Sequence, residues 1–150
     1  MKIVAIVQAR SQSIRLPNKI MKKICGKPMI GHLLDRLSQS KKINQIVVAT
    51  SKSNKENSLI NYLRKRRFNY YQGSENNVLE RYFKSAKKFS SDIIVRITAD
   101  CPLIDAKIVD KLINIFIKNK VDYVSNVFPP TYPDGLDVEV FSFSTLKKCY

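Results

Sequence analysis

A short segment near the amino terminus concentrates cations and hydroxyl groups. They are Arg10, Ser11, Ser13, Arg15 and Lys19. Arginine can hold phosphate oxygens through forked hydrogen bonds, lysine adds a point charge, and serine hydroxyls can donate further hydrogen bonds. These residue types are suited to binding several phosphate charges at once. The alternative is an ordinary basic loop in contact with solvent.

Acidic residues that could complement this segment come much later in the chain. Asp100 could hold magnesium, because this ion keeps much of its water and takes one or two protein oxygens in addition to substrate phosphates. Alternatively, Asp100 only caps a turn before the proline that follows. Asp134, Asp137 and Glu139 could hold a second metal ion or the hydroxyls of an acceptor, or they could be acids at a solvated strand edge.

The elements that must position these residues are predicted to be alternating strands and helices. Residues 3–7 form a continuous apolar run, which is typical of a buried strand. Further strands are expected at 46–49, 68–71, 93–98, 121–127 and 138–143, and helices from Lys27-Pro28, after Ser53 or Asn54, from Val78, after Asp105 and from Ser144. This order predicts an α/β fold in one domain, residues 1–150, with a mostly parallel sheet and helices on both faces.

The predicted topology places the cationic segment and Asp100 at the same end of the sheet. In a doubly wound sheet the first strand lies centrally, and a strand added on its other side opens a crevice where ligands bind. If residues 93–98 form that neighbouring strand, Asp100 faces the segment from Arg10 to Lys19 across the opening. We therefore expect these groups to share one ligand.

Composition limits the remaining function classes. The formal net charge is +15, which suggests a polyanion-binding module as an alternative function. However, the basic residues are spread over most predicted helices and aromatic residues do not interleave with them, so nucleic acid is not the expected partner. No apolar run approaches the ~18 residues of a membrane span, which predicts no membrane contact and a cytoplasmic location.

The sequence also resembles a known family. The pattern Gln-Ala-Arg-x-x-Ser-x-Arg-Leu-Pro-x-Lys at residues 8–19 is similar to the signature of cytidylyltransferases that activate sugar acids. The similarity is greatest to the SpsF-type branch and extends to CMP-Kdo synthetase and acylneuraminate cytidylyltransferase-like proteins. It runs along the whole chain, through residues 26–29, 47–50, 73–82, 96–105 and 132–141.

This resemblance implies a nucleotide-diphospho-sugar transferase fold (GT-A, Rossmann-like), CTP and a sugar acid as substrates, Mg²⁺ as cofactor and a homodimer as the assembly. It implies nucleotide binding by Gln8, Ala9, Arg10, Ser13, Arg15, Lys19, Gly73, Ser74, Val78 and Arg81. It also implies catalytic roles for Arg15, Lys19 and Asp100, with Asp100 as the metal ligand.

The expected reaction is transfer of CMP from CTP to the sugar acid, with release of pyrophosphate, in cell-surface polysaccharide biosynthesis. Such a reaction needs positioning and charge neutralisation rather than a protein nucleophile. Gln12 and Ala99 stand where the family usually has glycine, and family members continue beyond this length. A second hypothesis is therefore a nucleotide-binding protein that lacks turnover.

Overall fold

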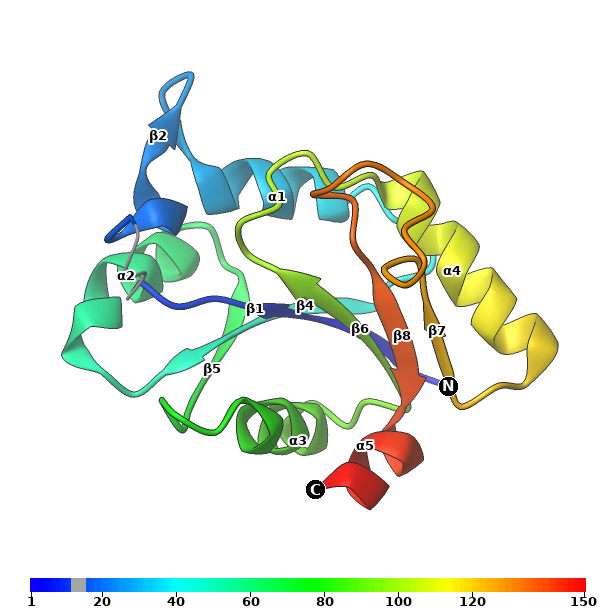
Figure 1. Cartoon of the computed structure of the whole chain (residues 1–150). Coiled ribbons are helices and arrows are strands. Elements are labelled where there is room, and N and C mark those ends of the chain that lie inside the picture. The colour runs from blue at the N-terminus through cyan, green and yellow to red at the C-terminus, as the bar shows by residue number, and fades with distance from the viewer. Residues whose placement is uncertain (12–15) are drawn as a thin grey trace.

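The centre of the molecule is the strand β1 (Ile3–Gln8), in which the first five residues are buried. The computed structural model describes residues 1–11 and 16–150 (Figure 1). β1 pairs in parallel with β4 (Gln45–Ser51) on one side and with β6 (Ile93–Thr98) on the other. The predicted central position of the first strand, with residues 93–98 beside it, is therefore confirmed.

The other strands extend this sheet in both directions. β5 (Asn69–Gly73) pairs in parallel with β4, whereas β8 (Glu139–Ser142) runs antiparallel to β6 and to β7 (Tyr123–Ser125). The resulting order in the described part of the chain is β5-β4-β1-β6-β8-β7. The sheet is thus mostly parallel, as predicted. The short strands β2 (Lys23–Ile24) and β3 (Lys27–Pro28) form a separate hairpin.

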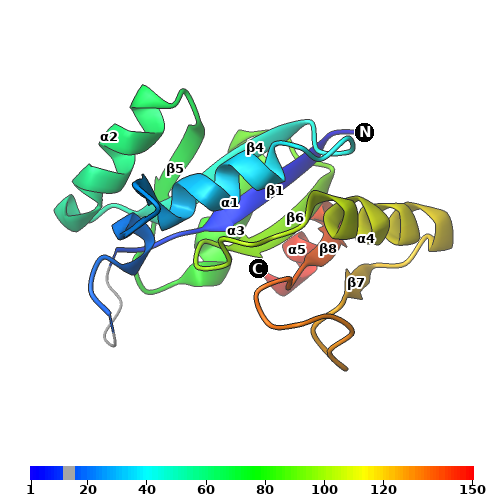
Figure 2. The ribbon, with the colours of Figure 1, turned by 90° about the horizontal axis from the view of Figure 1, so that it is seen from above.

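Helices cover both faces of the sheet (Figures 1 and 2). One face carries α1 (Met29–Leu37), α2 (Asn57–Lys65) and α4 (Ala106–Asn119), and the other carries α3 (Val78–Lys88) and α5 (Phe143–Cys149). Single 3₁₀ turns, η1 (Lys19–Met21) and η2 (Asn54–Glu56), follow the loops after β1 and β4. The fold is the predicted Rossmann-like α/β arrangement.

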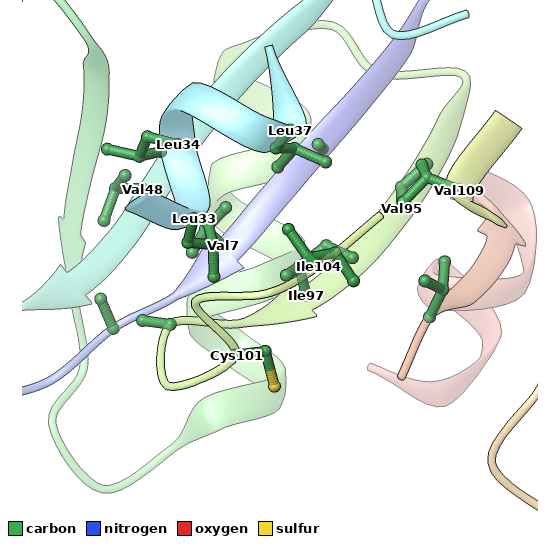
Figure 3. Close-up of a cluster of buried hydrophobic side chains, with 14 of the residues drawn as sticks. Val7, Leu33, Leu34, Leu37, Val48, Val95, Ile97, Cys101, Ile104 and Val109 are labelled. Carbon is green, nitrogen blue, oxygen red and sulfur yellow. The ribbon is translucent and has the colours of Figure 1, made fainter. Parts of the chain in front are cut away.

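Alternation along β1 divides the core into two clusters, because successive side chains of a strand point to opposite faces. Ala5 and Val7 join the cluster under α1, α2 and α4, and Val4 and Ile6 join the one under α3 and α5. Figure 3 shows the first cluster, in which Leu33 of α1 lies over Val7. A sheet buried on both sides holds the carboxyl ends of its central strands rigidly.

Several predicted bounds differ from the structure. The first helix begins at Met29 rather than at Lys27-Pro28, because those two residues pair with β2. The strand predicted at 121–127 is limited to β7, since the Asn126 side chain bonds to the backbone of Leu136 and Val138 instead of continuing the strand.

Some apolar side chains near the ends of the predicted helices are partly exposed. Val78 and Leu79 are 37% and 38% exposed, and Ile117 is 39% exposed. Val78 and Leu79 lie in the first turn of α3, and Ile117 lies near the end of α4. Apolar periodicity therefore overestimates burial at helix ends, where the sheet no longer covers the side chains.

Candidate functional site

Lys19 and Asp100 meet at the carboxyl ends of β1 and β6. Lys19 opens η1 after the cationic segment, and Asp100 lies two residues beyond the end of β6. The Nζ of Lys19 donates a hydrogen bond to Oδ2 of Asp100 at 2.6 Å, and the two side chains are 31% and 43% exposed. The expected convergence of these two segments is therefore confirmed.

This contact determines the protonation of Asp100. Burial alone would raise the pKa of the carboxyl, but the hydrogen bond and positive charge of Lys19 outweigh it and hold the pKa below its usual value. A hydrogen bond involving Thr98 acts in the same direction. Asp100 is consequently an anionic oxygen donor at neutral pH, which is the ligand type that magnesium prefers.

Backbone hydrogen bonds fix where the cationic segment leaves the sheet. The N–H of Ala9 donates to the carbonyl of Ala49 at 3.0 Å, and the N–H of Ala99 donates to the carbonyl of Gln8 at 3.0 Å. The segment closes on itself where the N–H of Asn18 donates to the carbonyl of Ser11 at 2.9 Å. Arg10, between these anchors, is exposed. Gln12, Ser13 and Arg15 lie outside the described residues, so their predicted roles are not located.

Glu56 holds the start of this segment and was missed by the sequence analysis. Its side chain is completely buried. Its two carboxylate oxygens accept hydrogen bonds from the N–H of Ser11 at 3.0 and 3.1 Å, and Oε2 accepts another from the Ser11 hydroxyl at 2.8 Å. Oε1 also accepts a hydrogen bond from the Ser51 hydroxyl at 3.3 Å. An acid beside a helix start is common, so no sequence signal distinguished Glu56.

The loop after β5 carries the predicted residues Gly73 and Ser74, and the buried Arg81 side chain holds this loop by a hydrogen bond to its backbone. Arg81 is 1% exposed, and its Nη1 donates to the carbonyl of Ser74 at 2.6 Å. Gly73 is packed so closely that a Cβ there would lie 3.2 Å from Cγ of Arg81. Val78 begins α3 at the rim, after the Asn77 side chain accepts a hydrogen bond from the N–H of Glu80.

Two buried polar groups of this region have unused hydrogen-bonding capacity within the part of the chain that the structure describes. They are the Nε and Nη2 of Arg81 and the Oε1 of Gln8. Burial lowers the pKa of Arg81, and the charge of Arg10 acts in the same direction whereas that of Glu56 opposes it. Arg10 and Glu56 are therefore close enough to Arg81 for their charges to act on its guanidinium.

The predicted acceptor acids divide into two groups. Burial raises the pKa of the Cys101 thiol, a hydrogen bond with Thr98 opposes it, and the charges of Asp100, Asp137 and Asp134 add smaller increases. Burial, together with Asp134 and Glu139, raises the pKa of Asp137. Asp134 and Asp137 therefore lie close enough to Cys101, the neighbour of Asp100 in the chain, for their charges to act on its thiol.

Glu139 has structural partners instead. It accepts a hydrogen bond from Arg96 of β6, and its Oε1 accepts one from the Tyr123 hydroxyl at 2.8 Å. Both oxygens of Glu139 therefore connect β8 to its two neighbouring strands.

Two features are absent from the residues that the structure describes. No three or more His, Cys, Asp and Glu side chains come together there as a preformed metal site. A magnesium ion would thus depend on Asp100 and on ligand oxygens. No helix within residues 1–11 and 16–150 is both long and apolar enough to span a membrane.

Comparison with known sequences gives a consistent family. The family model described as Cytidylyltransferase matches residues 4–150. The chain is 40% identical to the Uncharacterized protein MJ1063 of Methanocaldococcus jannaschii, over 100% of the chain and 60% of that protein. It is 31% identical to the spore coat polysaccharide biosynthesis protein SpsF of Bacillus subtilis, over 81% of the chain and 52% of that protein. The chain spans no more than about 60% of the length of these curated relatives.

Comparison with solved structures agrees with the sequence matches. A cytidylyltransferase from Leptospira borgpetersenii has a TM-score of 0.94 at 37% identity, covering 99% of this chain and 63% of that one. A CMP:2-keto-3-deoxy-manno-octonic acid synthetase, solved with CTP, has a TM-score of 0.80 at 19% identity, covering 99% of this chain and 77% of that one. The second likeness supports the fold alone.

Proposed function

Because this chain belongs to the cytidylyltransferase family, we propose that it binds CTP at the carboxyl ends of β1 and β6 and transfers CMP to a sugar acid. The contact between Lys19 and Asp100 carries this proposal. It brings a phosphate-binding cation and a metal-binding carboxylate to the same opening, which is where a nucleoside triphosphate with its metal ion would need both.

The residues around the opening have separate proposed tasks. Arg10, Ser13, Arg15 and Lys19 hold the triphosphate through charge and hydrogen bonds. Gln8, Ala9, Gly73, Ser74 and Val78 line the nucleoside, and Arg81 supports that wall through the Ser74 carbonyl. The unused acceptor of Gln8 and the unused donors of Arg81 are consistent with a polar ligand above them.

Magnesium fits the donor set at Asp100. A single anionic carboxylate with 43% of its side chain exposed can provide one oxygen while the substrate phosphates and water provide the others. When bound, the ion would neutralise charge that develops on the phosphates. Lys19 would then leave Asp100 and contact the triphosphate. A structural neighbour with a TM-score of 0.70, Rv0371c of Mycobacterium tuberculosis, was solved in complex with manganese.

The proposed reaction is an in-line displacement. A hydroxyl oxygen of the acceptor forms a bond to the α-phosphorus of CTP and releases its proton to water, while the bond from that phosphorus to the departing pyrophosphate breaks. Arg15 and Lys19 stabilise the departing negative charge. We assign the acceptor hydroxyls to Asp134 and Asp137, because Glu139 is bound to Arg96 and Tyr123.

The names of the relatives support a sugar acid of a cell-surface polysaccharide as acceptor. SpsF is named for spore coat polysaccharide biosynthesis, and a relative from Geobacter metallireducens, 30% identical over 75% of this chain and 44% of its own length, is named 3-deoxy-manno-octulosonate cytidylyltransferase. The acceptor class is therefore proposed as an acidic sugar.

Pyrophosphate release tests this function. CTP is incubated with a panel of sugar acids, with and without Mg²⁺, and ATP and GTP serve as control nucleotides. We expect release that requires CTP, Mg²⁺ and one sugar acid. Calorimetry that shows CTP binding no tighter than ATP or GTP would count against the cytidine assignment. CTP binding that never leads to pyrophosphate would favour the binding function without turnover.

A further inference from the structure

A fully buried carboxylate lies directly beneath the cationic segment. Glu56, at the end of η2, has both oxygens directed at the N–H and hydroxyl groups of Ser11, and one of them also contacts Ser51. A buried anion costs considerable desolvation free energy unless several donors compensate it. Because it would repel phosphate, Glu56 is poorly suited to contacting a nucleotide itself.

We propose that Glu56 is a positioning residue that fixes Ser11 and, through it, Lys19 where they can take part in binding the triphosphate. This inference rests on the proposed function and adds a residue that acts through the backbone rather than through the ligand.

A series of hydrogen bonds connects Glu56 to the residue that precedes Lys19. Glu56 holds the N–H of Ser11, and the carbonyl of Ser11 accepts the N–H of Asn18 at 2.9 Å. The next residue, Lys19, reaches Asp100. Fixing Ser11 therefore fixes both ends of the loop, with Arg10 preceding one end and Lys19 following the other.

Glu56 also acts electrostatically on Arg81, which supports the loop after β5. The charge of Glu56 acts on the buried guanidinium of Arg81, which holds the Ser74 carbonyl. The negative charge of Glu56 therefore favours the charged form of Arg81. Neutralising it would disturb the phosphate side most, because its direct hydrogen bonds go to Ser11.

The test compares the binding of CTP, which has three phosphates, with the binding of CMP, which has one. Calorimetry in the presence of Mg²⁺ measures CTP and CMP affinity for wild type and Glu56→Gln. The glutamine keeps the size of the side chain but replaces one acceptor by an NH₂ donor facing Ser11. We expect CTP affinity to fall about tenfold or more, while CMP affinity changes by less than about threefold. The preference for CTP over CMP should therefore collapse.

Asp110→Asn is the matched control. Asp110 of α4 accepts hydrogen bonds from the Ser40 hydroxyl and from the N–H of Lys41 at 2.9 Å, so it also anchors a loop through a serine and a backbone amide. This loop precedes β4 and so lies at the amino end of that strand, away from the carboxyl ends of β1 and β6. Asp110→Asn should lower the melting temperature and leave the ratio of CTP to CMP affinity unchanged.

A second variant applies if Glu56→Gln does not fold. Ser11→Ala removes one of the hydrogen bonds to Glu56 and retains the N–H. It should reduce the CTP preference in the same direction by a smaller factor. Hydrogen exchange at the Ser11 and Asn18 amides should become faster in either variant, whereas Asp110→Asn should not change it.

The possible results distinguish a failure of the proposed CTP-binding function from a failure of the proposed role of Glu56. Wild-type protein that binds CTP no better than CMP would contradict the proposed function. Wild-type protein that prefers CTP, together with variants that keep this preference, would overturn the role of Glu56 alone. Equal losses of CTP and CMP affinity would also overturn it, because they indicate general damage to the fold.

Discussion

The ion pair of Lys19 with Asp100 joins residues that are 81 positions apart in the sequence. With both side chains partly exposed, such a pair contributes only about 0–1 kcal/mol to folding. Its small energetic value makes the pair easy to separate. A metal ion and a triphosphate can therefore replace the two partners without a large cost in stability.

Asp100→Asn separates the two roles of this carboxylate. We expect pyrophosphate release to fall about 100-fold or more, because the amide loses the charge that holds the metal ion. The melting temperature should change little, as the ion pair is half-exposed. Steady-state assays across a range of Mg²⁺ concentrations, with calorimetric melting, measure both effects.

Asp35→Asn is the control for Asp100→Asn. Asp35 pairs with Lys27 and Arg66, outside the proposed site, so its loss should leave pyrophosphate release intact. Equal activity in wild type and Asp100→Asn would exclude Asp100 as the metal ligand.

Some residue-level features could be predicted from the sequence and others could not. Lys19 and Asp100 were predicted because each lies in the loop after a recognisable buried strand, and the carboxyl ends of adjacent parallel strands lie together. Glu56 was not, because its burial depends on Ser11 approaching from a segment 45 residues away. Neither composition nor helical periodicity contains that information.

At the level of elements, β8 is held to β6 by more than its backbone ladder. Arg96 of β6 and Tyr123 of β7 both contact the carboxylate of Glu139. β8 leads directly from the loop that carries Asp134 and Asp137. Anchoring this strand therefore sets where those two acids lie relative to Asp100.

Glu139→Gln should mainly reduce stability. We expect a loss of about 1–3 kcal/mol in the free energy of unfolding, because a partly buried ionic hydrogen bond is weakened. Glu80→Gln, which breaks an exposed pair with Lys84 on α3, should reduce stability much less, because solvent screens exposed charges. Urea unfolding measures both.

Kinetics of the same Glu139→Gln variant test the assignment of the acceptor residues. The KM for the acceptor should stay within about threefold of wild type once the protein is folded. A large rise in that KM with unchanged stability would instead place Glu139 at the acceptor.

The elements themselves were largely predictable, since β1, β4 and β6 are continuous apolar runs and α4 is marked by its capping residue Asp105. The shorter extent of β7 was not predicted. Its end depends on Asn126, whose amide bonds to Leu136 and Val138 across the loop. Such long-range side-chain contacts override local strand propensity.

The whole molecule carries a formal net charge of +15, far more than one nucleotide requires. The two kinds of polyanion binding should respond differently to salt. A long nucleic acid releases many counterions when cations bind it, so its affinity falls steeply as salt rises. A triphosphate seated among Lys19, backbone donors and a metal ion makes fewer and shorter-range contacts.

We therefore expect labelled single-stranded DNA to lose at least about tenfold in affinity between ~50 and ~300 mM NaCl, and CTP to lose less. Fluorescence anisotropy measures the first and calorimetry the second. Lys19→Met should weaken CTP and leave DNA binding unchanged, because DNA would contact cations distributed over many helices. DNA that binds tightly at high salt and is displaced by CTP would instead make the opening above β1 and β6 a nucleic-acid site.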